Sequence, residues 1–165
     1  MSQQTVIDSL AFARDGAVLE GNLRVASLER LHDQLTKVDG ELSFRLEGRL
    51  VGREKTPELL LSVRGALSLR CQRCLGGLPH QVQVDSVLEL IESEDDLTQE
   101  DLEDDSRDFL PAQKDLDVAG LVEEEVLLDL PVAPRHESCV MPEAAVATEK
   151  ASPFAALAAL NGKTS

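Results

Sequence analysis

The chain has 165 residues, enough for one domain with a hydrophobic core and too few to expect two. Its 31 acidic and 16 basic residues give a net charge of −15, which counts against DNA as a partner because a polyanion repels phosphates. Only 2% of the residues are aromatic, which counts against single-stranded nucleic-acid binding by base stacking.

The N-terminal sequence and the cysteine content predict a cytoplasmic protein. Residues 1–16 lack the basic start and the apolar run of a signal peptide. No stretch approaches the roughly 18 apolar residues of a membrane span, so we expect no membrane partner. Three cysteines, an odd number, are typical of a reducing compartment where thiols are free or metal-bound.

The first half of the chain predicts a sheet with short helices. We expect a helix over Val6–Ala13, a strand over Ala17–Val25 and a helix from Ser27 to about Leu35. Three longer segments then alternate between apolar and polar residues. Their apolar rows are Leu42, Phe44, Leu46 and Leu50; Leu59, Leu61, Val63, Leu67 and Leu69; and Val82, Val84, Leu88 and Leu90. This period predicts antiparallel strands with one buried face, joined by short turns.

Glycines interrupt the apolar rows, and the later segments have other patterns. Gly48 and Gly65 mark bulges or close approaches of another chain segment. Residues 92–108 form an acidic low-complexity run, expected to be a mobile loop. A helix is expected over Asp115–Leu130, with an apolar stripe comprising Ala119, Val122, Val126 and Leu130.

The predicted fold class is α+β: an antiparallel meander, open or barrel-like, with an acidic helix and short terminal helices. Residues 1–130 are expected to form the single domain, including the acidic insertion 92–108. Residues 131–152 are expected to form a flexible linker and residues 153–161 a short C-terminal helix that begins at Pro153.

The charge is concentrated in one part of the chain. Residues 1–88 carry 11 acidic and 11 basic groups, whereas residues 89–129 carry 17 acidic groups against Arg107 and Lys114. Such a segment attracts basic proteins. A solvated acidic loop that only aids solubility is the alternative interpretation.

The three cysteines suggest a metal site. Cys71 and Cys74 form a Cys-x-x-Cys motif at a turn between two predicted strands, followed by two glycines. A structural zinc site needs four ligands, and His136 with Cys139 can complete the set. A structural turn without metal is an alternative, and so is a redox pair, although redox pairs usually open a helix.

The chain contains no phosphate-binding loop, nucleophile elbow or Ser/His/Asp arrangement, so we expect a non-enzymatic protein. Three stretches, in order, resemble the YceD family of bacterial proteins. They are residues 69–75 around the Cys-x-x-Cys motif, residues 121–136 ending in Leu-Pro-Val-Ala-Pro-Arg-His, and residues 153–160. The resemblance implies a ribosome-biogenesis role in the synthesis, processing or stability of large-subunit (23S) ribosomal RNA. Some branches of the family carry further cysteines after the Leu-Pro segment, which suggests a metal there.

Two binding mechanisms follow from joining the resemblance to the charges. In the first, segment 92–108 and the helix acids Glu123, Glu124 and Glu125 bind a basic ribosomal protein or rRNA-processing factor on a ribosomal precursor particle. In the second, a patch of arginines contacts rRNA directly. Its members are Arg45, Arg49, Arg64, Arg70 and Arg73.

Both mechanisms have plainer alternatives. The arginines can instead pair with Glu47 and Glu58 on a solvated sheet face. Phe154 and Leu157 form an apolar face on the C-terminal helix, which docks either on its own domain or in a partner's groove. The alternative function is a zinc- or thiol-dependent protein that uses Cys71 and Cys74.

Overall fold

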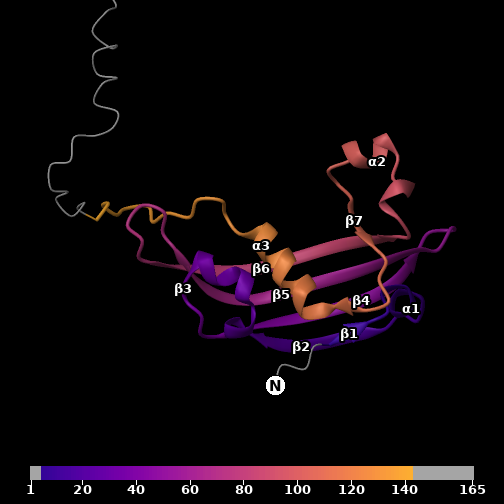
Figure 1. Ribbon diagram of the computed structural model, residues 1–165, viewed down its shortest axis with the longest axis horizontal. Helices are drawn as coiled ribbons and strands as arrows, with labels where there is room; N and C mark the ends of the chain where they lie inside the picture. Colours follow the sequence, from indigo (N-terminus) through magenta and orange to yellow (C-terminus); the bar gives the residue numbers. More distant parts are fainter. Residues whose placement is uncertain (1–4, 143–165) are drawn as a thin grey trace, which may run out of the picture.

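The computed structural model describes residues 5–142. Its main element is a sheet in which β2, β4, β5, β6 and β7 follow one another in space, while β3 pairs with β5 (Figure 1). The strands are β2 (Val18–Arg24), β3 (Leu35–Lys37), β4 (Glu41–Val51), β5 (Thr56–Arg70), β6 (Gly77–Ile91) and β7 (Asp108–Pro111). All pairs are antiparallel except β6 with β7. The fold is thus mixed α/β and mostly sheet.

The sheet corrects the antiparallel, barrel-like expectation in two respects. β2 and β7 stand at its two ends and do not pair, so the sheet is open. β7 runs parallel to β6, with Leu88 opposite Asp108. A parallel pair requires a crossover connection of about a dozen residues or more. Residues 92–107 provide this connection, which alternation of residue types within the strands could not reveal.

The expected N-terminal helix is shorter than predicted, because Val6–Ile7 form β1, which pairs with β8 (Leu116–Asp117). Helix α1 (Ser9–Arg14) begins after Asp8, whose side chain accepts a hydrogen bond from the Ala11 N–H. The helix expected from Ser27 is replaced by two 3₁₀ segments, η1 (Val25–Ser27) and η2 (Glu29–Gln34). Such tight turns are common as short connectors.

Helix α3 (Val118–Asp129) lies across one face of the sheet (Figure 1). The Asp117 side chain caps it by accepting the Ala119 N–H, and the helix ends before Pro131, as expected. The buried stripe differs from the predicted one: Ala119 and Leu130 are only half-buried, whereas Val118 and Leu121 are buried. No helix in residues 5–142 is long and apolar enough to cross a membrane.

The hydrophobic core lies between α3, α1 and one face of the sheet. The apolar rows of the three long strands are buried as predicted, except for Leu50, which is 38% exposed. Leu50 is the penultimate residue of β4, next to the hairpin turn. Gly48 and Gly65 mark close approaches and not bulges, because the β4–β5 register is continuous through both. A Cβ at Gly48 would lie 2.4 Å from the Phe12 carbonyl oxygen, so α1 packs on β4 only because this residue is glycine.

Segment 92–108 is not the structureless loop that we expected. It contains η3 (Glu94–Asp96) and α2 (Gln99–Glu103), each begun by a capping box. Ser93 and Thr98 are the capping residues, and Asp96 and Asp101 return their hydrogen bonds. The two aspartate carboxylates accept the backbone N–H groups of Ser93 and Thr98, which stabilises these short helices within an acidic run.

Candidate metal centre and charged surfaces

The turn between β5 and β6 places two cysteines close together. It covers residues 71–76 and is closed by hydrogen bonds from the Cys71 N–H to the Gly76 carbonyl (2.9 Å) and from the Leu75 N–H to the Cys71 carbonyl (2.9 Å). Leu75 has a φ of 63°, which is uncommon for a residue with a side chain. The Arg73 N–H points at the Cys71 sulfur at 3.5 Å. The turn thus has backbone donors directed at a thiol.

The chain that follows α3 returns to this turn. The Gln72 N–H donates to the Pro134 carbonyl (2.8 Å), and the Arg73 guanidinium donates to the Cys139 carbonyl (3.3 Å). These contacts place His136 and Cys139 beside the Cys-x-x-Cys turn. The first residues of the segment expected to be a linker therefore contribute to the candidate site.

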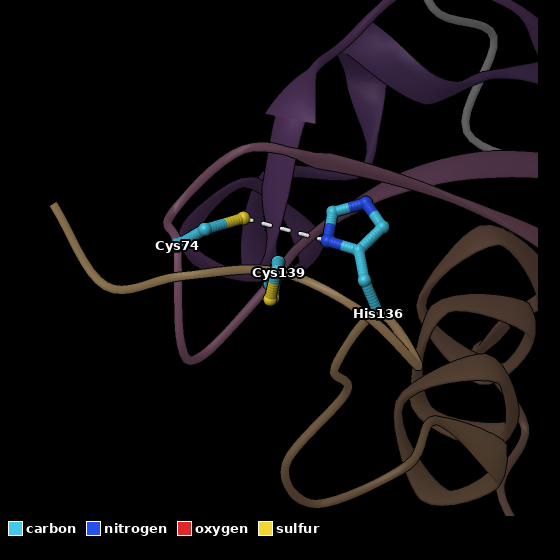
Figure 2. Close-up of side chains that lie close together, drawn as sticks. Cys74, His136 and Cys139 are labelled. Atoms are coloured by element: carbon cyan, nitrogen blue, oxygen red, sulfur yellow. Dashed lines mark hydrogen bonds between the residues drawn. The ribbon is translucent and has the colours of Figure 1, made fainter.

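The four predicted ligands come together. The ligand atoms of Cys71, Cys74, His136 and Cys139 all lie within 4.8 Å of one another. The Cys71 and Cys139 sulfurs are 3.8 Å apart. Figure 2 shows the Cys74 sulfur directed at His136 Nδ1, at 3.4 Å, with Cys139 beside them. In a tetrahedral site with Zn–S of about 2.3 Å and Zn–N of about 2.0–2.1 Å, these separations would be about 3.8 and about 3.6 Å. The cluster therefore has dimensions that suit a tetrahedral ion.

The second nitrogen of His136 orients the ring. His136 Nε2 lies 3.0 Å from the Gly77 carbonyl oxygen, which can only accept, so Nε2 carries the proton in this contact. The Nδ1 lone pair then faces the Cys74 sulfur. A carbonyl that holds the remote N–H of a histidine is the usual outer partner of a metal-binding imidazole.

The thiols differ in their ionisation. The pKa of Cys71 is lowered to about 5, chiefly because the Cys74 backbone N–H donates to its sulfur, with further donation from the Arg73 and His136 backbones, although burial opposes the shift. The pKa of Cys139 is raised by burial and by the neighbouring Cys71 and Cys74 sulfurs. A thiolate at Cys71 suits a metal ligand. Cys71 is buried, so its sulfur is not exposed to a substrate.

The arginines proposed for rRNA contact are engaged within the protein. Arg45 pairs with Glu20 and Glu47, as directed by the register that sets Glu20 opposite Arg45. Arg49 pairs with Glu58 at 2.7 Å. The pairing with Glu47 and Glu58 is the one that the sequence suggested.

The remaining arginines of that group have other partners. Arg64 pairs with Asp85 across the β5–β6 ladder at 2.7 Å. Arg70 donates to the Leu35 carbonyl (3.2 Å), and Arg73 contacts Cys139 as described. Glu20 and Asp85 could not be identified as partners from sequence, because they become neighbours only through the strand register.

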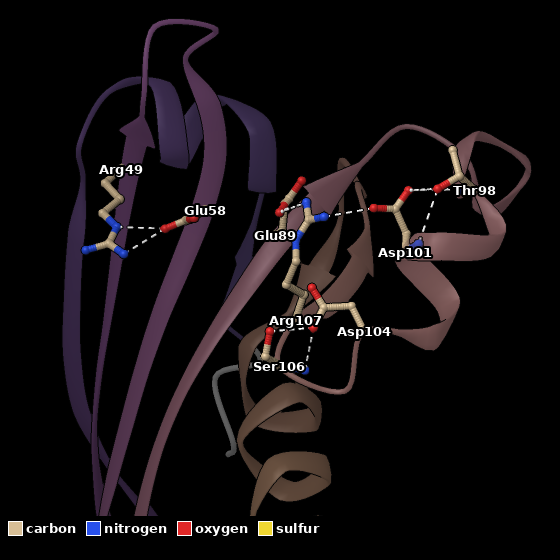
Figure 3. A network of polar contacts seen from close by, with 8 residues as sticks. All are labelled: Arg49, Glu58, Glu89, Thr98, Asp101, Asp104, Ser106 and Arg107. Carbon is tan, nitrogen blue, oxygen red and sulfur yellow. Dashed lines mark hydrogen bonds and ion pairs between the residues drawn. The ribbon is translucent and has the colours of Figure 1, made fainter.

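The acidic segment is tied to the sheet by one cation. Arg107 pairs with Glu89 of β6 (2.6 Å) and with Asp101 of α2 (2.8 Å) (Figure 3). Its guanidinium also lies 4.8 Å from the centre of the Phe109 ring. The pKa of Asp101 is lowered, first because the Thr98 hydroxyl and N–H donate to its carboxylate and then because of Arg107. Most other carboxylates of the segment are exposed.

The helix acids fall into different environments. Glu123 is only 8% exposed and accepts a hydrogen bond from the Arg30 backbone N–H (2.7 Å), so it faces the fold and not a partner. Glu124 is exposed, with Arg30 Nη1 at 3.9 Å. Glu125 accepts a hydrogen bond from the Ser86 hydroxyl. Phe154 and Leu157 lie outside the described residues.

The comparison with known families adds the identity that geometry does not supply. The family model described as large ribosomal RNA subunit accumulation protein YceD matches residues 59–161. The chain belongs to the YceD family. The match begins at β5 and includes all four residues of the candidate metal centre. The family's description implies a role in the accumulation of large-subunit ribosomal RNA. No solved structure matches the chain.

Proposed function

We propose that this YceD-family protein is a non-enzymatic, cytoplasmic factor of ribosome biogenesis that supports the synthesis, processing or stability of 23S ribosomal RNA. It acts by binding a basic protein, either a ribosomal protein or an rRNA-processing factor on a ribosomal precursor particle. The family description supports the RNA process. The charge imbalance of residues 89–129 is the observation that carries the choice of partner.

The acidic surface has little internal compensation. Exposed carboxylates of segment 92–108 are Glu92, Glu94, Asp95, Asp96, Glu100, Glu103, Asp104, Asp105 and Asp108. Arg107 is one of two basic residues between 89 and 129, and it already forms ion pairs with Glu89 and Asp101. A basic protein surface would be attracted to this field and oriented by it.

Direct rRNA contact has weaker support. Arg45, Arg49 and Arg64 would have to leave their carboxylates to reach phosphates, and those carboxylates would then repel the RNA. Arg70 and Arg73 remain near the turn, but two arginines supply few phosphate contacts. The protein-partner mechanism is therefore the better supported one.

The cysteine cluster is proposed to bind zinc as a structural ion. Zinc at Cys71, Cys74, His136 and Cys139 would have four protein ligands, which leaves no position for a substrate or a reactive water. The ion would fasten the segment after α3 to the β5–β6 turn. The burial of Cys71 also opposes the alternative of a thiol-dependent enzyme.

A tagged pull-down from growing cells, with and without RNase, tests the proposed partner. We expect a basic protein to be recovered equally well after RNase treatment, because its contact is with carboxylates and not through RNA. Raised salt should lower the recovery, since exposed charge pairs are screened. Recovery of ribosomal components only without RNase would contradict the proposal and would favour rRNA as the direct ligand.

A further inference from the structure

Strand β6 has an uncovered edge. On the side away from β5, β7 pairs only with Leu88–Ile91. Among residues 5–142, no strand lies beside the preceding part of β6. The Gly77 carbonyl is taken by His136 and Pro79 has no N–H, so the available edge extends from His80 to Val87. An edge of this kind presents unpaired backbone N–H and C=O groups, which are a template for another strand.

A groove runs beside this edge. It has a volume of about 560 Å³ and lies between residues 84–88 of β6, helix α3 and the start of β7. Leu88 and Leu121 are buried along it, while Leu128, 75% exposed, stands on its α3 side. The groove therefore combines a partly apolar lining with an available strand edge.

The rim of the groove is acidic. Its carboxylates belong to Asp85, Asp108, Glu124, Glu125 and Asp129. Asp85 has an arginine partner, and Glu124 has one at 3.9 Å. Among the residues that the structure describes, the other three carboxylates form no ion pair. The rim thus retains negative charge.

These carboxylates are too dispersed for a single metal ion. Within residues 5–142, the cysteine cluster is the one group of potential ligand atoms close enough to share an ion. A second copy of the chain is also a poor occupant, because it would bring the same carboxylates face to face. Charges spread along a strand edge instead match a ligand whose cations are spaced along an extended chain.

We propose that this groove binds an extended, lysine- or arginine-rich segment of the partner by strand addition to the β6 edge. The inference rests on the proposed function. It adds where the partner binds, at the β6 edge, and that the bound segment of the partner is extended. Alternate side chains of an added strand face opposite sides of the sheet. One set meets Glu124, Leu128 and Asp129 of α3, and the other meets Asp85 and the 45% exposed Val87. Backbone hydrogen bonds supply affinity, and the carboxylates select basic side chains.

A short peptide of alternating lysine and valine, titrated into the full-length protein by calorimetry, tests the groove. We expect binding, with slower amide exchange at residues 83–87 in NMR spectra. The double variant Glu124→Gln/Asp129→Asn should weaken binding about tenfold, because two exposed charge pairs are lost. Both residues are exposed, so the variant should fold. A peptide methylated at alternate backbone nitrogens should bind at least about tenfold more weakly, because it cannot complete a ladder.

The double variant Glu94→Gln/Glu100→Gln is the matched control, with the same change in charge at exposed residues of segment 92–108. It should weaken binding by less than about threefold, through the general field alone. Equal effects of the two double variants, undiminished binding of the methylated peptide, a dimer that protects residues 83–87 without peptide, or no binding at all would overturn the inference. An RNase-resistant basic partner in the pull-down would then still support the proposed function, so the two failures are distinguishable.

Discussion

His136 shows how one backbone contact prepares a side chain for metal binding. The Gly77 carbonyl holds Nε2–H, which leaves Nδ1 free to act as a ligand beside Cys74. Without this contact, either nitrogen could carry the proton. The contact exists only because the chain after α3 lies against the turn.

Purified protein is expected to contain about one zinc ion per chain by elemental mass spectrometry. Cys74→Ser should remove most of it and should speed amide exchange at residues 134–139, because the ion fastens this segment to the turn. Ser138→Ala, next to the ligand Cys139, is the control and should retain zinc. Folded wild-type protein that does not bind zinc at neutral pH would contradict the structural-ion interpretation.

The ligand set illustrates what spacing alone can predict. Cys71 and Cys74 are three positions apart in sequence, so their convergence in a turn is predicted by local spacing alone. His136 and Cys139 were candidates only because few other ligands were present, and the contacts of Gln72 and Arg73 that bring them near depend on the tertiary fold. The polar partners Glu20 and Asp85 depend on register in the same way.

Among the elements, the crossover segment 92–107 with its helix α2, which we call the α2 excursion, differs most from its prediction. Low-complexity acidic composition usually indicates a solvated loop. Here capping boxes at Ser93 and Thr98 and the Arg107 pairs give it local order. The acidic composition predicts the exposure of most of these carboxylates, but the pairing of Arg107 with Glu89 depends on how the chain crosses over from β6 to β7.

Lowering the pH is expected to loosen this excursion before the sheet. The pKa of Asp101 is below its ordinary value of 3.8, so its contacts stabilise the folded state above that pH. That contribution is lost progressively as the pH falls below the ordinary value and through the folded-state pKa. NMR exchange, corrected for intrinsic rates, should show residues 99–103 losing protection while β5 keeps it.

At neutral pH, Arg107→Gln should reduce protection over residues 99–103 in the same way, because it removes the link to Glu89 and Asp101. Lys114→Gln is the control, since it removes one positive charge outside that network. In the pH experiment, loss of amide protection in β5 and in residues 99–103 at one common pH would show that the excursion has no stability separate from that of the sheet.

The long strands were the most predictable elements. Their alternation of apolar and polar residues follows directly from a sheet with one buried face, and the buried rows match it apart from Leu50. Alternation does not distinguish an open sheet from a barrel, since both bury one face. Alternation also does not predict that β7 runs parallel to β6, because the connection between two strands decides their relative direction.

At the scale of the whole molecule, positive and negative charges differ in how far they are paired within the fold. Three sheet arginines are neutralised by neighbouring strands, whereas most acids of residues 89–129 face solvent with little compensation. The cysteine cluster and the α2 excursion lie toward opposite ends of the sheet (Figure 1). This separation allows a structural ion and a binding surface to work independently.

The central claim is that the acidic surface supports large-subunit rRNA by holding a basic partner. Its most direct test is the ratio of large- to small-subunit rRNA in cells whose only copy carries Glu94→Gln, Glu100→Gln, Glu124→Gln and Asp129→Asn. The control copy carries Glu29→Gln, Asp33→Asn, Asp39→Asn and Glu54→Gln, an equal charge change at exposed acids outside residues 89–129. We predict that the ratio falls toward that of a deletion strain with the first copy and stays normal with the control. A normal ratio with both copies, at equal protein levels, would contradict the account.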